Sequence, residues 1–199
     1  QMKSVGEVMA LGSSFAESLQ KAVSSLEEKR KYLGHNTTSS SDEDLRQRLS
    51  CPSSIRLHYV YDAIKAGYSN EEIFEASFID PWFLGQMRKI ANMEETLRKS
   101  APEDRAELLP TAKLLGFSDL AIADFWQQSE AELRAFRLEQ NLRPVFKRVD
   151  SCAAEFASPT PYMYSTYGDE CESNPSDQKK VMILGSGPNR IGQGIEFDY

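Results

Sequence analysis

The sequence predicts a mainly α-helical fold: a helical bundle of two similar halves, then a short segment of strand and loop, and then the first strand of an α/β domain. Three observations lead to this prediction. Signals that start helices recur at short intervals over 45–142 of the 199-residue chain. Apolar residues follow these signals at helical spacing. After Pro144 the pattern changes to the alternation typical of strands.

The first predicted helix begins at Ser14. Ser14 can cap the helix, and Glu17 stands three residues later, as in a capping box. The apolar residues that follow recur every three or four positions and form one face: Phe15, Leu19, Ala22, Val23 and Leu26. We expect this helix to end near Lys31 and the polar stretch 35–44 to link two units.

A short internal repeat predicts two turns between helices. The sequence GYSNEEI at 67–73 is echoed by GFSDLAI at 116–122. In each copy the glycine suits the left-handed conformation after one helix, the serine caps the next helix, and the aromatic residue packs on the isoleucine one turn into it. The first copy also has a glutamate three residues after its serine, which completes a capping box, so its turn should be the firmer one.

Two further helix starts are predicted downstream. Asp80 caps a helix that has Pro81 at its first position, where a missing N–H is no loss, and this helix should be the longest one. Ser129, with Glu132 three residues later, starts another helix over 131–141.

Two segments depart from this regular pattern. Pro110 interrupts 103–115, so we expect either a first-turn proline or a helix that is broken there. After Pro144 the chain alternates like a strand, most clearly over 162–167. The polar stretch 168–179 is then expected to be a loop before a final strand.

Composition excludes several classes of protein. The net charge of −7 argues against nucleic-acid partners, and no apolar run approaches the roughly 20 residues that span a bilayer. Cys51, Cys152 and Cys171 are an odd number without CxxC spacing, which fits a reducing cytoplasm. His35 and His58 belong to no Cys/His cluster of metal-binding spacing, so both are expected to be structural or solvated.

The end of the chain carries a glycine-rich motif. Residues 180–199 are predicted to form a buried strand, a glycine-rich turn and the opening of a helix. Gly185 and Gly187 match the first two glycines of a dinucleotide fingerprint, but Arg190 stands where the third would let strand and helix close up. A dinucleotide site and a structural turn both stay open. Because one strand is unstable without partners, we expect the chain to be a piece of a larger protein.

Four stretches, which follow one another along this sequence as they do in that family, resemble the large chain of carbamoyl-phosphate synthase. The sequence GSGPNRIGQGIEFDY at 185–199 resembles the start of its second synthetase half, and MKSVGEVMA at 2–10 resembles the close of its first ATP-grasp half. The sequence IDPWFL at 79–84 resembles its helical middle, and FKRVDSCAAEF at 146–156 resembles the run into the second half.

The resemblance implies three parts. Residues 1–26 would end the first ATP-grasp half, which forms carboxyphosphate; residues 27–176 would be the helical oligomerisation domain and connector; residues 177–199 would start the second half, which makes carbamoyl phosphate. It also implies self-association through the helical domain, by an apolar helix face.

The complete enzyme of this family makes carbamoyl phosphate from bicarbonate, two ATP and ammonia, for arginine and pyrimidine synthesis. A small amidotransferase chain releases the ammonia from glutamine. ATP and Mg or Mn are its cofactors, and the resemblance implies that their binding residues lie outside this chain. We therefore assign no catalytic, cofactor-binding or metal-binding residue here and expect the chain to be inactive by itself.

Three positions match the wall of the tunnel through which this family passes carbamate: Glu7, Gly194 and Glu196. A small residue keeps a bore open, and carboxylates supply acceptors to a small polar species. Structural roles stay open for each: a helix cap for Glu7, close backbone approach for Gly194, and pairing with Arg190 for Glu196. The alternative function, from another class, is a free-standing helical adaptor whose glycine loop binds a nucleotide.

Overall fold

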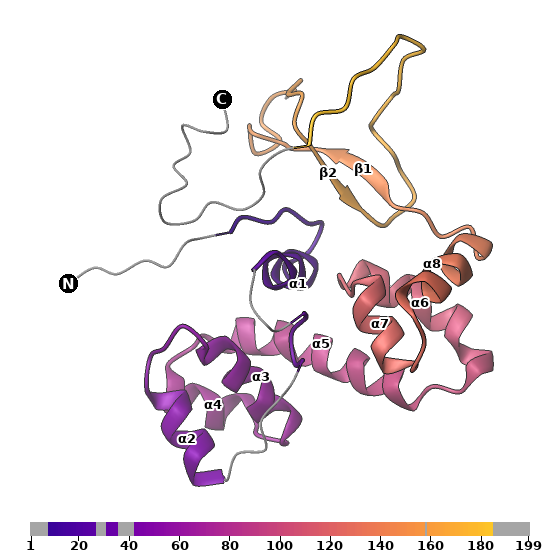
Figure 1. Ribbon diagram of the computed structural model, residues 1–199. Coiled ribbons are helices and arrows are strands. Elements are labelled where there is room, and N and C mark those ends of the chain that lie inside the picture. Colours follow the sequence, from indigo (N-terminus) through magenta and orange to yellow (C-terminus); the bar gives the residue numbers. More distant parts are fainter. Residues whose placement is uncertain (1–7, 27–30, 36–41, 158, 185–199) are drawn as a thin grey trace.

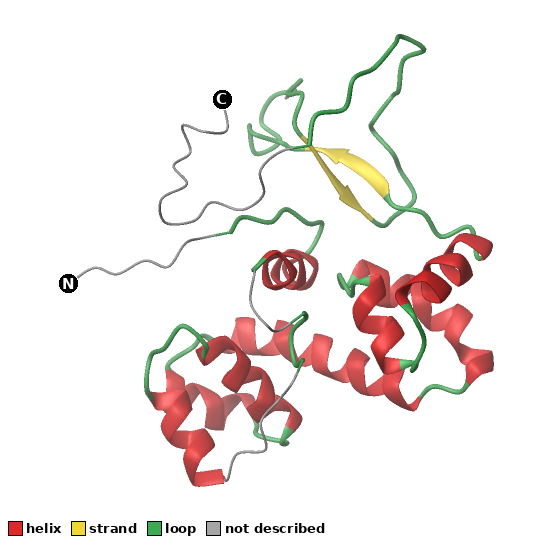
Figure 2. Cartoon of the chain, in the orientation of Figure 1, coloured by secondary structure: helices red, strands yellow, loops and turns green. Residues whose placement is uncertain are grey.

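The computed structural model describes residues 8–26, 31–35, 42–157 and 159–184. Within these ranges most of the regular structure is helical, and a small two-stranded sheet follows the helices (Figure 2). This confirms the predicted mainly α class. The elements are α1 Phe15–Ser25, α2 Asp42–Ser50, α3 Arg56–Lys65, α4 Asn70–Ser77, α5 Pro81–Lys99, the 3-10 helix η1 Pro102–Asp104, α6 Arg105–Leu114, α7 Asp119–Phe125, α8 Glu130–Glu139, β1 Val145–Arg148 and β2 Met163–Thr166.

The long helix α5 is shared by two groups of helices. Helices α2, α3 and α4 gather near one end of α5, and α6, α7 and α8 lie toward its other end (Figure 1). As predicted, Asp80 caps α5, its carboxylate accepting the Trp82 N–H at 2.8 Å, and Pro81 occupies the first position. The buried face of α5 includes Leu84 and Ile90, which belong to one continuous core. The two halves are therefore joined through α5.

The repeated turns form as predicted. Gly67 and Gly116 both have left-handed backbones, with φ of +95° and +93°. Ser69 makes the complete capping box with Glu72, whereas Ser118 only accepts the N–H three residues on. The aromatic residue and the isoleucine of each copy are buried, so each turn fixes one helix against the next.

Two predicted helix boundaries are wrong. Helix α1 ends at Ser25 and not near Lys31, because Leu26 already has an extended backbone with φ −67° and ψ 125°. Helix α6 neither begins nor breaks at Pro110 but runs through it. Pro110 is exposed, so the carbonyl that proline leaves without a helical partner can bond to water.

The short segment 31–35 packs into the helical domain. Tyr32 and Leu33 are buried, and the Tyr32 hydroxyl donates to the carboxylate of Asp124 in α7. A Cβ on Gly34 would lie 2.6 Å from the ring of Tyr61 in α3. Helix α2 then begins inside the predicted linker 35–44.

Strand β1 pairs with β2 in antiparallel register, with Val145 opposite Thr166 and Arg148 opposite Met163. This confirms the strands predicted after Pro144. The final strand predicted before the glycine loop is not formed in the described part of the chain. The side chains at 181–184 are 85–90% exposed, because the described residues supply no neighbouring strand to pair with them.

Candidate functional site: the junction around Glu17

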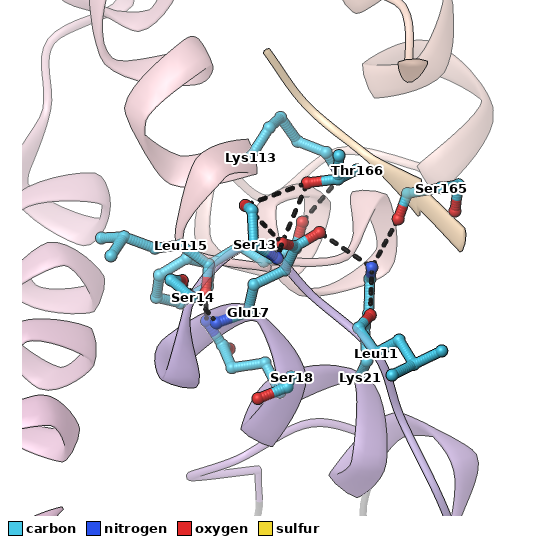
Figure 3. Close-up of polar contacts among 12 residues, drawn as sticks. Leu11, Ser13, Ser14, Glu17, Ser18, Lys21, Lys113, Leu115, Ser165 and Thr166 are labelled. Carbon is cyan, nitrogen blue, oxygen red and sulfur yellow. Dashed lines mark hydrogen bonds and ion pairs between the residues drawn. The ribbon is translucent and has the colours of Figure 1, made fainter. Parts of the chain in front are cut away.

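A buried carboxylate joins the residues before α1 to strand β2. Glu17 is only 1% exposed. Its Oε2 accepts hydrogen bonds from the Ser13 N–H at 2.6 Å, from Ser13 Oγ at 2.9 Å and from Thr166 Oγ1 at 2.9 Å (Figure 3). Ser13 Oγ and Thr166 Oγ1 also lie 3.2 Å apart. Residues distant in sequence therefore meet at one side chain.

The local sequence explains how Glu17 reaches this position. Ser14 caps α1, and its Oγ accepts the Glu17 N–H at 3.2 Å, which puts Glu17 in the first turn. The other half of the predicted capping box is wrong: the Glu17 carboxylate accepts from Ser13 and not from the Ser14 N–H. The carboxylate bonds instead to Ser13 and to the Thr166 hydroxyl, which is a second donor at this position.

Lys21, one turn further along α1, also contacts the residues before α1, α1 itself and strand β2. Its Nζ lies 2.8 Å from Glu17 Oε1 and donates to the carbonyl oxygens of Leu11, at 2.8 Å, and of Ser165. One ammonium group thus holds the backbone before α1 and the backbone of β2 on the same helix face.

The protonation state of Glu17 follows from these contacts. Burial disfavours the charged carboxylate, but hydrogen bonds from Lys21, Ser13 and Thr166 outweigh it and hold the pKa below its ordinary value of 4.5. The carboxylate is therefore ionised at neutral pH, with its oxygens already occupied by donors. That arrangement suits a structural anchor and not a general base.

The second glycine turn packs directly on α1. A Cβ on Gly116 would lie 2.7 Å from Glu17 Cα, so the turn leaves no room for a side chain. The Gln20 side chain adds a hydrogen bond, its Nε2 donating to the Leu115 carbonyl at 2.9 Å. This close approach places α6 and α7 beside the Glu17 junction.

A second cluster of charges holds the residue after β2. Lys113 is 5% exposed and donates to the Phe117 carbonyl at 2.6 Å and to Asp119 at 2.7 Å. Arg137 of α8 pairs with the other oxygen of Asp119 at 2.9 Å. Both cations lie over the ring of Tyr167, at 5.1 and 5.9 Å from its centroid. Tyr167 is thereby held by cation–π contacts beside three helices.

An open cavity of about 490 Å³ lies at the junction. It is lined by residues of α1, of the turn between α6 and α7, and of β2, including Leu11, Lys21, Lys113, Tyr164 and Tyr167. The two lysines already bond to carbonyl and carboxylate oxygens. The charged groups of the cavity are therefore already engaged within the chain.

The remaining candidate residues are scattered. His58 is buried in α3, and the His35 ring lies 4.9 Å from that of Tyr32. Cys51, Cys152 and Cys171 are free thiols. Within the described ranges, no three His, Cys, Asp or Glu residues come together as a potential metal site, and no helix there is both long and apolar enough to cross a membrane.

The predicted tunnel positions Glu7, Gly194 and Glu196 lie outside the described residues, as does the glycine loop. Sequence reasoning missed Lys21 and Thr166. A strand threonine carries no local signal for a distant buried carboxylate.

The fold and the junction define a class: a helical scaffold domain in which a connector strand is held against the first helix. Comparison with known families gives the particular one. The family model described as the carbamoyl-phosphate synthetase large chain, oligomerisation domain, matches residues 7–141. The chain belongs to this family. Residues 177–199 match the carbamoyl phosphate synthase preATP-grasp domain.

Relatives agree along the whole chain. The carbamoyl phosphate synthase large chains of Pasteurella multocida, Haemophilus ducreyi and Neisseria meningitidis are 53%, 54% and 51% identical to it, over 100% of its length. The chain spans about 18% of the length of each of these relatives. The predicted family is confirmed, and the free-standing adaptor is not favoured. The domain boundaries predicted at 26/27 and 176/177 stay predictions.

Proposed function

We propose that this sequence is the oligomerisation and connector region of a glutamine-dependent carbamoyl-phosphate synthase large chain. The observation that carries the connector role is the hydrogen bond from Thr166 to Glu17, which holds the strand after the helical domain against helix α1. The match of residues 7–141 to the oligomerisation domain supports the assembly role.

The proposal includes the chemistry of the complete enzyme. That enzyme would make carbamoyl phosphate from bicarbonate, two ATP and ammonia, in the cytoplasm, with a small amidotransferase chain as its source of ammonia. ATP and Mg²⁺ or Mn²⁺ would bind to large-chain sequence other than the described residues, which form an anchor of satisfied side chains. The work of this region is then to position two catalytic halves, because an intermediate made in one must reach the other.

The junction suits this positioning role for a physical reason. Glu17 and Thr166 are 1% and 3% exposed, so their hydrogen bond is shielded from competing water. An unpaired carboxylate at this depth would cost several kcal/mol, so the contact strongly favours one arrangement of the strand on the helix.

The connector role can be tested in a large chain that carries this sequence. Thr166→Val keeps the shape of the side chain and removes its donor. We expect it to lower the carbamoyl phosphate formed per ATP hydrolysed, while bicarbonate-dependent ATP hydrolysis continues. Ser165→Ala is the matched control, because the Ser165 side chain is exposed on the same strand. An unchanged ratio in Thr166→Val would contradict the connector role.

The tunnel wall at Glu7, Gly194 and Glu196 is part of the same proposal. Its support is the resemblance of the surrounding motifs to the family. Gly194→Phe in the large chain should abolish overall synthesis while both partial reactions continue, because a bulky ring would close the bore. Unchanged overall synthesis with unchanged partial ATPase would overturn the assignment.

A further inference from the structure

Where α4 meets α5, aromatic side chains lie exposed at the surface. We call this surface the aromatic corner and define it by the exposed Phe74, Phe78, Trp82 and Phe83 and by the half-buried Phe15 of α1. Phe78 is 81% exposed and Trp82 is 55% exposed. The rings form two groups: the centroids of Phe74 and Phe78 lie 6.1 Å apart, and those of Phe15, Trp82 and Phe83 lie 5.1 to 5.3 Å apart. Exposed aromatic side chains in such groups mark an interaction surface more often than isolated exposed residues do.

The backbone of Phe78 supports an interaction role. Phe78 ends α4 in the left-handed conformation, with φ 57° and ψ 22°. This position favours glycine or asparagine and is strained for a bulky side chain. Because the ring is mostly exposed, burial within one copy of the chain does not explain why a phenylalanine stands there.

Exposed charges of opposite sign lie on the two helices that carry the corner. Glu71 and Glu75 share the exposed face of α4 with Phe74 and Phe78 at helical spacing. On α5, the exposed Lys89 lies two turns after Trp82, on the same face. Helix α4 thus adds acidic residues to the surface, and α5 adds a basic one.

We propose that the aromatic corner binds the same corner of a second copy of this chain, related by a two-fold axis. A two-fold contact pairs one surface with itself in reversed direction, so that Glu75 of each copy can meet Lys89 of the other. The inference rests on the proposed function, in which the helical domain self-associates, and it names the surface.

The test uses sedimentation velocity on the 199-residue chain from micromolar to several hundred micromolar concentration. In Phe78→Asn we expect dimerisation at least tenfold weaker, with a melting temperature equal to or above that of the wild type, because asparagine suits the left-handed backbone. Phe156→Asn is the matched control, since Phe156 is 73% exposed in the loop between β1 and β2. It should leave dimerisation unchanged.

Charge exchange gives a second arm. Glu75→Lys should weaken dimerisation, and adding Lys89→Glu to it should restore the affinity. If Phe78→Asn dimerises as strongly as the wild type, the aromatic corner is not the contact surface, and the proposed function stays intact. An equal loss of dimerisation affinity in Phe156→Asn and Phe78→Asn would also overturn the aromatic corner, because it would indicate unspecific apolar association. A wild type that stays monomeric throughout would instead contradict self-association itself.

Discussion

The Thr166 hydroxyl donates a hydrogen bond to the carboxylate of Glu17 at 2.9 Å, across 149 positions of sequence. The bond joins the last residue of β2 to the first turn of α1. Ser13 and Lys21 bond to the same carboxylate from the backbone and helix beside it. The connector strand is therefore part of the structure that organises the first helix, and the variants below test how much each contact contributes.

The two glycine turns provide a matched pair. Both glycines have nearly the same left-handed φ, but a Cβ on Gly67 would meet no described atom within 4 Å, whereas one on Gly116 would lie 2.7 Å from Glu17 Cα. We expect Gly67→Ala to lower the free energy of unfolding by about 1 kcal/mol through its backbone alone. Gly116→Ala should cost about 1–3 kcal/mol more, because α1 must move. Urea denaturation followed by helical circular dichroism measures both, and equal losses would contradict the close packing of α1 on this turn.

Glu94 and Glu95 are adjacent on α5 but differ in burial. Glu94 is 1% exposed and accepts from the Tyr61 hydroxyl at 2.7 Å, from Lys65 at 2.7 Å and from Arg98 at 2.8 Å. Because both cations are partly exposed, water compensates part of the loss, and Glu94→Ala should cost about 2–3 kcal/mol. Glu95 pairs with Lys99 at the surface, so Glu95→Ala should change the stability much less than Glu94→Ala. Thermal and urea unfolding of the two variants would contradict this account if Glu95→Ala were the more damaging.

Stability should fall in acid partly through Glu17. Its pKa is depressed in the folded protein, so its contribution is present above the ordinary value of 4.5 and is lost as the pH falls through the folded value. Asp119 acts in the same direction. Burial raises its pKa, but the hydrogen bonds from Arg137 and Lys113 outweigh burial, so the pKa is also held below its ordinary value. We expect Glu17→Gln to be less stable than the wild type at pH 7, with the difference shrinking below about pH 4.5. The urea midpoints of the wild type and of Glu17→Gln are measured from pH 7 to pH 3. A constant difference between the two midpoints over this range would refute this role of Glu17.

Local signals predicted much of the fold. The caps at Ser69, Asp80 and Ser129 and the left-handed glycines appear where the sequence pattern indicates them, because caps and turns are decided by residues a few positions apart. The path of α6 through Pro110 was not predictable in this way, since it depends on which side of the helix faces solvent.

The junction was predictable only in part. The pattern around Ser14 placed Glu17 in the first turn of α1, but the partner that completes the site is Thr166, on a strand that no local spacing connects to that helix. Lys113 and Arg137 likewise converge on Asp119 only after three helices pack together. The tunnel positions stay predictions from the family resemblance.

A double-mutant cycle between Glu17 and Thr166 tests most directly whether this contact holds the connector on the helical domain. The free energies of unfolding of the wild type, Glu17→Ala, Thr166→Val and the double variant are measured by urea denaturation, with Ser165→Ala in place of Thr166→Val as the control cycle. We predict a coupling energy of about 1–2 kcal/mol for the first cycle and about zero for the control. A coupling within about 0.3 kcal/mol of zero between Glu17 and Thr166 would contradict the account.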